Sequence, residues 1–309
     1  PSKPSTLADL KGVVDTAMSP DPQFPINAPD LVRQSSGPLA ATSRLDDLLG
    51  RCPAMQAVKA AASRLLDAEY TSRHEQRPVV LITGEPGTGK EMLARALHED
   101  GPFGTQPFAT LDCMSVTAEI VDSLRPDAAP RCRIAGTASD GAEPVVPASG
   151  TVFLDEIGEL DASLQSRLLR ALDSVPASRL VRAGARTRRR IIAAASVDLD
   201  ALARAGRFRG DLLSRLKVVP LQLPPLRERG EDIPMLANHF LRVHGARYGK
   251  PGLALSAAAQ RRLAKLEWPG NVRQLRDCME RAVALTHDLL IGDDALEPAL
   301  ATGVPGPAE

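Results

Sequence analysis

Between about residues 45 and 225, short apolar runs alternate with longer stretches of helical periodicity. The four clearest runs have the length and composition of buried strands: PVVLIT, PFATLD, TVFLDE and RRIIAAAS. The stretch LDDLLGRCPAMQAVKAAASRLL, which precedes them, has the spacing of an amphipathic helix. Apolar strands separated by helices predict an α/β fold, with a mainly parallel sheet covered by helices on both faces.

The pattern changes after KVVPLQLPPLRERGED, where strand-like runs cease. Three helical stretches follow: EDIPMLANHFLRVHGARYG, SAAAQRRLAKL and NVRQLRDCMERAVALT. Ser256 and Asn271 stand where the N-caps of the last two helices are expected, and Trp268 is expected to pack inside this helical unit. We predict four segments: a linker-like tail over 1–44, an α/β nucleotide domain over 45–225, a helical lid domain over 226–298 and a tail over 299–309.

Composition limits the class of protein. The 38 basic residues balance the 38 acidic ones, so no net charge attracts nucleic acid to the whole surface. No apolar run is long enough to cross a bilayer and no leader-like segment opens the chain. We therefore expect a cytoplasmic protein without a membrane partner. The cysteines have no spacing typical of zinc or a disulfide framework: Cys52, Cys113, Cys132 and Cys278.

A glycine-rich segment, GEPGTGKE, follows the first strand and precedes the helical stretch MLARALHED. Strand, GxxxxGK turn and helix in this order are typical of a phosphate-binding loop. Its glycines allow the backbone N–H groups to face a phosphate, and Lys90 would reach the β- and γ-phosphates of ATP. Glu91 replaces the hydroxyl that usually helps to hold Mg²⁺. The predicted nucleotide-binding residues of the loop are Gly84, Glu85, Pro86, Gly87, Thr88, Gly89, Lys90 and Glu91.

The strand TVFLDE ends in an acidic pair, Asp155 and Glu156. The apolar strand would deliver Asp155 to the Mg²⁺ region, and Glu156 would polarise the attacking water. An acidic pair at a strand end is common in turns, so the prediction depends on the loop that precedes it. Together the two motifs predict an ATP-hydrolysing site.

Four motifs in this order resemble the AAA+ domain of bacterial sigma-54-dependent transcription activators. They are GEPGTGKE, GTVFLDEIGELDASLQSRLLRAL, GRFRGDLLSRLKVVPLQLPPLRERGEDIP and WPGNVRQLRDCMERAV, and the similarity covers about Leu48 to Leu296. Glu91 matches this family, which typically has Glu after the loop lysine. The resemblance implies that Arg209 and Arg215 are arginine fingers, which reach the γ-phosphate bound by a neighbouring subunit. It also implies that Arg273 is the lid residue that senses nucleotide.

The resemblance further implies the partners of the chain. Members of the family assemble into rings, so we expect a homo-oligomer, and a hexamer in particular. RNA polymerase or its sigma factor is the expected target. DNA would be bound through a domain that these residues do not contain.

The chain departs from the family pattern at three places. Ala195 and Ser196 replace the usual Thr-Asn after IIAA. Asp112 replaces an Asn that restrains the catalytic Glu in the family, and a second carboxylate there would repel Glu156 or share a proton with it. The interval SLRPDAAPRCRIAGTASDGAEPVVPASG lacks the GAFTGA loop that grips sigma-54. We therefore expect a regulator that does not remodel sigma-54 polymerase.

Several alternatives remain open at this point. The chain could be a nucleotide-sensing scaffold with negligible ATP turnover, or a competent activator in which Arg131 to Gly141 replaces GAFTGA. A chaperone-like remodeller would share the ATPase core, but PPLRERGEDIP and WPGNVRQL favour the regulator family. The basic run VRAGARTRRR, residues 181–190, is interpreted as a solvated hairpin, with an anion-binding surface as the alternative.

Overall fold

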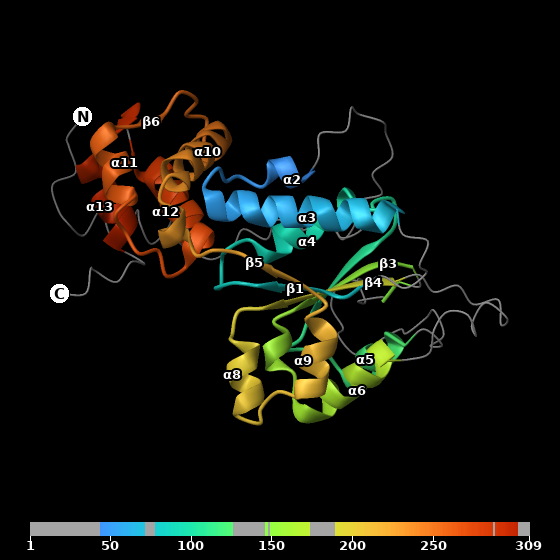
Figure 1. The fold of residues 1–309 in the computed structure, drawn as a ribbon. Coiled ribbons are helices and arrows are strands. Elements are labelled where there is room, and N and C mark those ends of the chain that lie inside the picture. The colour runs from blue at the N-terminus through green and yellow to red at the C-terminus, as the bar shows by residue number, and fades with distance from the viewer. Residues whose placement is uncertain are drawn as a thin grey trace, which may run out of the picture. The chain divides into compact units, whose positions relative to one another are not determined.

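The structure, a computed structural model, describes residues 44–71, 78–125, 146–147, 149–173, 189–286 and 288–301. A five-stranded sheet lies at its centre, in the strand order β2-β3-β4-β1-β5, and every neighbouring pair is parallel (Figure 1). The strands are β1 (Val80–Thr83), β2 (Phe108–Asp112), β3 (Gly150–Asp155), β4 (Arg189–Ala195) and β5 (Val219–Gln222). The predicted α/β class and the four predicted strands are confirmed.

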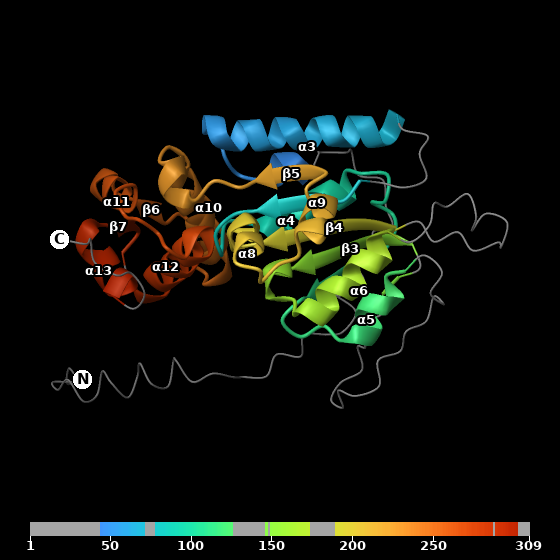
Figure 2. The same cartoon turned by 60° about the horizontal axis from the view of Figure 1, so that its bottom comes forward.

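Helices cover both faces of the sheet, and Figures 1 and 2 both show α3 and α4 on one face and α5 and α6 on the other. The side chains of the strands alternate between the two cores, as the twofold period of a strand requires: Val80 and Ile82 pack under α3 and α4, whereas Leu81 packs under α5, α6 and α9. The elements around the sheet are α2 (Arg44–Asp47), α3 (Pro53–Thr71), α4 (Lys90–Glu99), α5 (Ala118–Ser123), η2 (Ile157–Glu159), α6 (Ala162–Asp173), α8 (Leu199–Arg204) and α9 (Gly210–Leu216).

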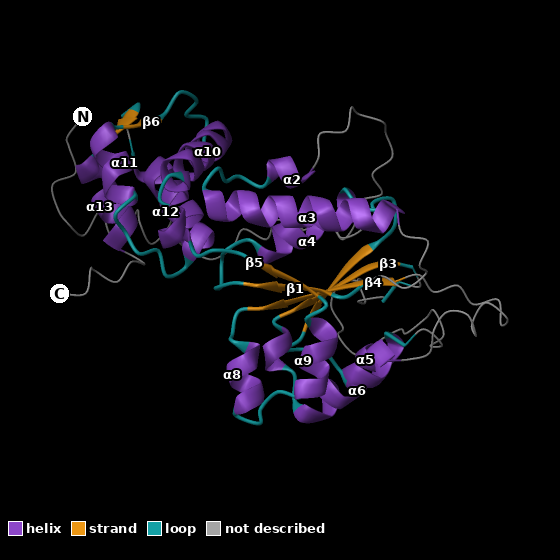
Figure 3. Cartoon of the chain, in the orientation of Figure 1, coloured by secondary structure: helices purple, strands orange, loops and turns teal. Residues whose placement is uncertain are grey.

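A second, mainly helical unit follows β5 (Figure 3). Its apolar core contains Trp268, which is fully buried and donates from Nε1 to the carbonyl of Leu263 at 2.8 Å. The predicted N-cap Ser256 is confirmed, because its Oγ accepts from the N–H of Ala259 at 3.1 Å. The elements are η4 (Leu226–Arg229), α10 (Asp232–Arg247), β6 (Ala254–Leu255), α11 (Ala257–Leu263), α12 (Asn271–Leu285), β7 (Leu290–Ile291) and α13 (Asp293–Ala301).

The four predicted strands do not include β5, and the prediction that strand-like runs cease after KVVPLQLPPLRERGED is wrong for β6 and β7. β5 lies at the edge of the sheet, where β1 is its one neighbour among the described strands. An edge strand tolerates Pro220, which has no N–H to donate, but the proline interrupts the sequence pattern that predicts a strand. β6 and β7 form a parallel pair of two residues each, too short to give a periodic signal. Within the described ranges, none of the helices has the length and apolarity to cross a bilayer.

The end of the basic run 181–190 is part of the core, and the prediction of a solvated hairpin is wrong there; residues 181–188 lie outside the described residues. Arg190 in β4 is fully buried, pairs with Glu69 of α3 at 3.1 Å and donates to the carbonyl of Leu97 at 2.6 Å. Arg189 donates to the carbonyls of Pro147 and Ser123 at 2.7 and 2.6 Å. A buried guanidinium at this place fixes α3 and α4 on the sheet.

We predict that Arg190→Leu lowers the free energy of unfolding by about 3–5 kcal/mol, because the carboxylate of Glu69 then stays buried without this partner. Urea denaturation measures the effect. The same substitution at the exposed Arg64 of α3 is the control and should change the free energy by less than about 0.5 kcal/mol. If Arg190→Leu lowers the free energy of unfolding no more than Arg64→Leu does, the ion pair between Arg190 and Glu69 does not stabilise the fold as we infer.

Candidate functional site

The glycine-rich loop joins β1 to α4 at the carboxyl edge of the sheet. Gly87 and Gly89 have φ angles of 78° and 103°, in the left-handed region that favours glycine. Thr88 Oγ1 donates to the carbonyl of Glu85 at 2.8 Å, which closes the turn. α4 begins at Lys90, so its unpaired N–H groups and the positive end of its dipole lie beside the loop. This is the local structure that binds phosphate at a helix N-terminus.

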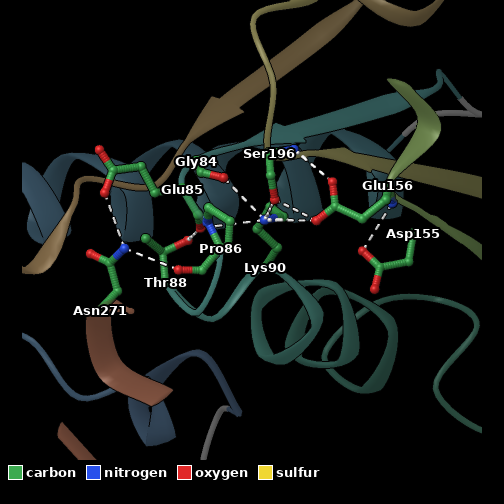
Figure 4. A network of polar contacts seen from close by, with 9 residues as sticks. All are labelled: Gly84, Glu85, Pro86, Thr88, Lys90, Asp155, Glu156, Ser196 and Asn271. Atoms are coloured by element: carbon green, nitrogen blue, oxygen red, sulfur yellow. Dashed lines mark hydrogen bonds and ion pairs between the residues drawn. The ribbon is translucent and has the colours of Figure 1, made fainter. Parts of the chain in front are cut away.

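Three strand ends bring polar side chains together beside this loop (Figure 4). Lys90, whose side chain is only 6% exposed, donates from Nζ to the carbonyl of Gly84 at 3.0 Å and to Ser196 Oγ at 2.5 Å. Its ammonium lies 3.4 Å from Glu156 Oε1. Ser196 follows β4, and its N–H donates to Glu156 Oε2 at 2.9 Å while its hydroxyl donates to Oε1. Lys90, Ser196 and Glu156 thus form one connected group at the end of β1, β3 and β4.

The acidic pair carries more negative charge than Lys90 alone balances. Burial, and then the charge of Glu156, raises the pKa of Asp155 above its ordinary value. Asp155 Oδ1 accepts from the N–H of Glu156 at 3.1 Å, and Glu156 has a left-handed φ of 51°. Carboxylate oxygens suit Mg²⁺, and among the described residues no group of three or more His, Cys, Asp and Glu side chains could hold a metal ion alone. Asp155 therefore fits a Mg²⁺ ion that takes its remaining ligands from phosphate and water.

We predict that Asp155→Asn raises the melting temperature of the nucleotide-free protein by a few degrees near neutral pH. The raised pKa means that folding disfavours the carboxylate, a cost that is full above the folded pKa and absent below the ordinary value of 3.8. Asparagine keeps an acceptor for the N–H of Glu156 and has no charge. Thermal unfolding should therefore show the gain near neutral pH and none in strong acid. Asp67→Asn, an exposed control on α3, should show neither; equal behaviour of the two variants would contradict the argument.

Asp112 makes contacts that the sequence did not predict. Its Oδ1 accepts from the N–H of Met114 at 2.9 Å and its Oδ2 from Ser115 Oγ at 3.5 Å, so the carboxylate closes the turn after β2. The residue that holds Glu156 is instead Ser196, whose hydroxyl and N–H engage both carboxylate oxygens. The sequence signal for this role was a short hydroxyl side chain directly after the fourth strand.

Of the two predicted arginine fingers, Arg209 lies directly before α9 and Arg215 within it, and both make their contacts away from the loop. Arg209 precedes the helix and binds Asp211 through two contacts of 3.0 and 2.6 Å. Arg215 pairs with Asp173 of α6 at 3.4 Å. Both side chains are about 45% exposed. The structure therefore does not bring them to Lys90 and Glu156 within one chain, and a role in trans remains a prediction.

The first turn of α12 lies against the glycine-rich loop. The N–H of Arg273 donates to the carbonyl of Gly87 at 3.3 Å, and its side chain is exposed beside the loop. Asn271, the expected N-cap of α12, does not cap the helix: it accepts from the N–H of Leu226 at 2.7 Å and donates to the carbonyl of Pro86 at 3.0 Å. The prediction is wrong because these partners outside the helix engage its amide. Glu91, the last residue of GEPGTGKE, pairs with Arg95 at 2.7 Å on the surface of α4.

Comparison with known proteins matches residues 48–222 to the Sigma-54 interaction domain and residues 227–308 to the AAA+ ATPase lid domain. The DNA-binding transcriptional regulator NtrC of Azospirillum brasilense is 37% identical over 307 residues, which are 98% of this chain and 60% of NtrC. The transcriptional regulatory protein XylR of Pseudomonas putida is 40% identical over 235 residues, 74% of this chain and 41% of XylR.

Solved structures of NtrX resemble this chain in fold. The complex of NtrX from Brucella abortus with ADP has a TM-score of 0.63 and 28% identity, covering 84% of this chain and 55% of NtrX. The complex of NtrX with ATP has a TM-score of 0.62 and 27% identity, covering 86% and 58%. The chain thus spans 60% or less of the length of these relatives. By its two matched domains, the chain belongs to the family of AAA+ domains of sigma-54-dependent transcription activators.

Proposed function

We propose that this chain binds ATP and Mg²⁺ at the loop 84–91 and hydrolyses ATP as the AAA+ module of a bacterial transcription regulator. The observation that carries the proposal is the convergence of Lys90, Ser196 and the acidic pair beside a helix N-terminus. The ADP and ATP complexes of the related NtrX support the same ligand class.

The chemistry follows from what each side chain can do. Lys90 would leave Ser196 and Glu156 for the β- and γ-phosphates, because the phosphates offer more negative charge. Bound Mg²⁺, held by Asp155, would neutralise charge on the phosphate oxygens. Glu156 would accept a proton from water as the water oxygen bonds to the γ-phosphorus and the bond to the ADP oxygen breaks. The products are ADP and phosphate.

We further propose that the active site is completed by a neighbouring copy of the chain. Arg209, directly before α9, and Arg215, within it, are exposed and pair with carboxylates at the surface, so a phosphate brought by a neighbour would compete for them. A ring, a hexamer in particular, would supply every site with these arginines. Contact with DNA would belong to parts of the protein outside these residues.

The absence of GAFTGA from the sequence bears on whether the proposed ATPase acts on sigma-54 polymerase. The sequence between Ser123 and Gly150 contains no such motif, and residues 126–145 and 148 of it lie outside the described residues. We propose that the protein regulates transcription without remodelling sigma-54 polymerase. A purified system with a sigma-54 promoter tests this, with an NtrC protein as positive control: no open complex should form. ATP-dependent open complexes would contradict the proposal and would assign the GAFTGA role to this interval.

A nucleotide-sensing scaffold is the second candidate, and one observation favours it. Both oxygens of Glu156 are bound by Ser196, so the base is engaged before any nucleotide arrives. Calorimetry of ATP binding, together with phosphate release in the presence of Mg²⁺, separates the two functions. Binding with turnover supports the ATPase, and binding without turnover supports the scaffold. Absence of binding, with Lys90→Ala behaving like the natural chain, would contradict both.

A further inference from the structure

The side of the glycine-rich loop that faces away from Lys90 is tied to two other segments by a polar junction. We define the junction as Glu85 in the loop, Arg227 in η4 and Asn271 at the start of α12. Arg227 donates to the two oxygens of Glu85 at 2.9 and 2.7 Å, and Asn271 Nδ2 donates to Glu85 Oε2 at 3.1 Å (Figure 4 shows the contact between Glu85 and Asn271). Three segments distant in sequence therefore meet at one carboxylate.

The side-chain amide of Asn271 connects three segments of the chain. The residue is fully buried, and its φ of 53° is a left-handed value that costs most residues energy but that Asn tolerates. Its Oδ1 accepts from the N–H of Leu226 at 2.7 Å, and Nδ2 also donates to the carbonyl of Pro86 at 3.0 Å. The side-chain amide of Asn271 thus joins the glycine-rich loop, η4 and the first turn of α12.

The backbone of the loop is in contact with the same turn of α12. A Cβ atom on Gly87 would lie 2.3 Å from the carbonyl oxygen of Gly270, so a side chain cannot fit between the two segments. The N–H of Arg273 donates to Gly87. Arg227 and then Asn271 lower the pKa of Glu85, which keeps the junction charged at neutral pH. The loop cannot change its backbone conformation without moving these contacts.

We propose that Asn271 and Glu85 are positioning residues through which the phosphate-binding loop and the helical lid respond together to a nucleotide. This rests on the proposed ATP binding at the loop. A phosphate that draws the N–H groups of residues 87–89 inward moves Glu85 and the carbonyl of Pro86. The junction passes that movement to α12, and it also holds the loop in the binding conformation before the nucleotide arrives.

The chain contains its own reporter for this coupling. Trp268 is the one tryptophan in the sequence, and its carbonyl accepts from the N–H of Asn271 at 2.7 Å. Its indole is fully buried in the lid core. A movement of the first turn of α12 changes the surroundings of this ring, so its fluorescence reports on the lid and not on the phosphate-binding loop itself.

The test measures ADP binding by calorimetry and Trp268 fluorescence at saturating ADP in the same proteins. Glu85→Gln keeps one oxygen but cannot serve both donors, and Asn271→Gly keeps the left-handed backbone while removing the amide. Both variants should bind ADP about tenfold more weakly, since each loses a hydrogen bond that involves a charged group. The fluorescence change seen in the natural chain should be lost. Glu228→Gln is the matched control: it removes the same charge from the residue next to Arg227 and should behave like the natural chain.

The outcomes separate this inference from the proposed function. If the natural chain does not bind ADP, the proposed function fails, and this inference fails with it. If it binds ADP but Trp268 fluorescence stays constant, the coupling is wrong while nucleotide binding at the loop stands. Affinities of both variants within about twofold of the natural chain would likewise overturn the role of the junction. Glu85→Gln keeps the test decisive if Asn271→Gly does not fold, because Glu85 is partly exposed.

Discussion

Glu156→Gln is expected to reduce ATP turnover by at least about a hundredfold while ATP still binds. The amide keeps the size of the side chain and can still contact Ser196, but it cannot take a proton from the attacking water. Binding should survive because the phosphates would be held by Lys90 and the loop, which the substitution leaves in place. Phosphate release at saturating ATP and Mg²⁺ measures the first quantity, and calorimetry measures the second.

Glu159→Gln is the control for this experiment, because Glu159 is an exposed glutamate three residues further along the chain. It removes the same charge near the site and should leave turnover unchanged. Equal turnover in Glu156→Gln and the natural chain would show that another group serves as the base. Loss of ATP binding in Glu156→Gln would show that its carboxylate has a structural role in the loop, through its contacts with Lys90 and Ser196.

Arg209→Ala is expected to reduce turnover about a thousandfold without weakening ATP binding to the isolated chain. Its guanidinium would neutralise charge on the transferred phosphoryl group of a neighbour, whereas its contacts within the chain are with Asp211 and Ser166. Phosphate release at high protein concentration measures the loss. Arg207→Ala is the control, since Arg207 is exposed two residues earlier and uses backbone atoms in its contacts: its N–H donates to the carbonyl of Leu202 at 2.9 Å and its carbonyl accepts from Gln165 Nε2 at 3.0 Å.

Mixing the two inactive variants tests the shared site directly. A site formed by the natural Glu156 of an Arg209→Ala chain and the natural Arg209 of a Glu156→Gln chain is complete. An equimolar mixture should therefore recover a substantial part of the natural turnover, and dilution should remove it again. A mixture as inactive as its components would contradict a site that takes Arg209 from a neighbour.

The sequence predicted the elements that bear strong local patterns. The four main strands are mainly apolar runs, and the glycine-rich loop has a spacing that leaves few other conformations. β5 was missed because Pro220 interrupts an edge strand, and β6 and β7 because a pair of two residues has no period. Local pattern thus predicts the sheet but not the short elements at its margins.

The contacts that organise the site could not be predicted, because they join segments distant in sequence. Asn271 has the residue type and position of an N-cap, and only the fold brings Leu226 and Glu85 to its amide. Arg190 belongs to a basic run, and only the fold buries it against Glu69. The bond between Ser196 and Glu156 depends on the adjacency of β3 and β4, and the sequence predicted a parallel sheet but not the order of its strands.

The most direct measurement is phosphate release from ATP over a wide range of protein concentration in the presence of Mg²⁺. If each active site combines Lys90 and Glu156 of one chain with Arg209 of another, turnover per chain should rise with concentration and level off once assembly is complete. ATP binding without turnover at any concentration would mean that the chain senses the nucleotide without hydrolysing it. Turnover per chain that stays constant from the lowest concentration would contradict the shared active site.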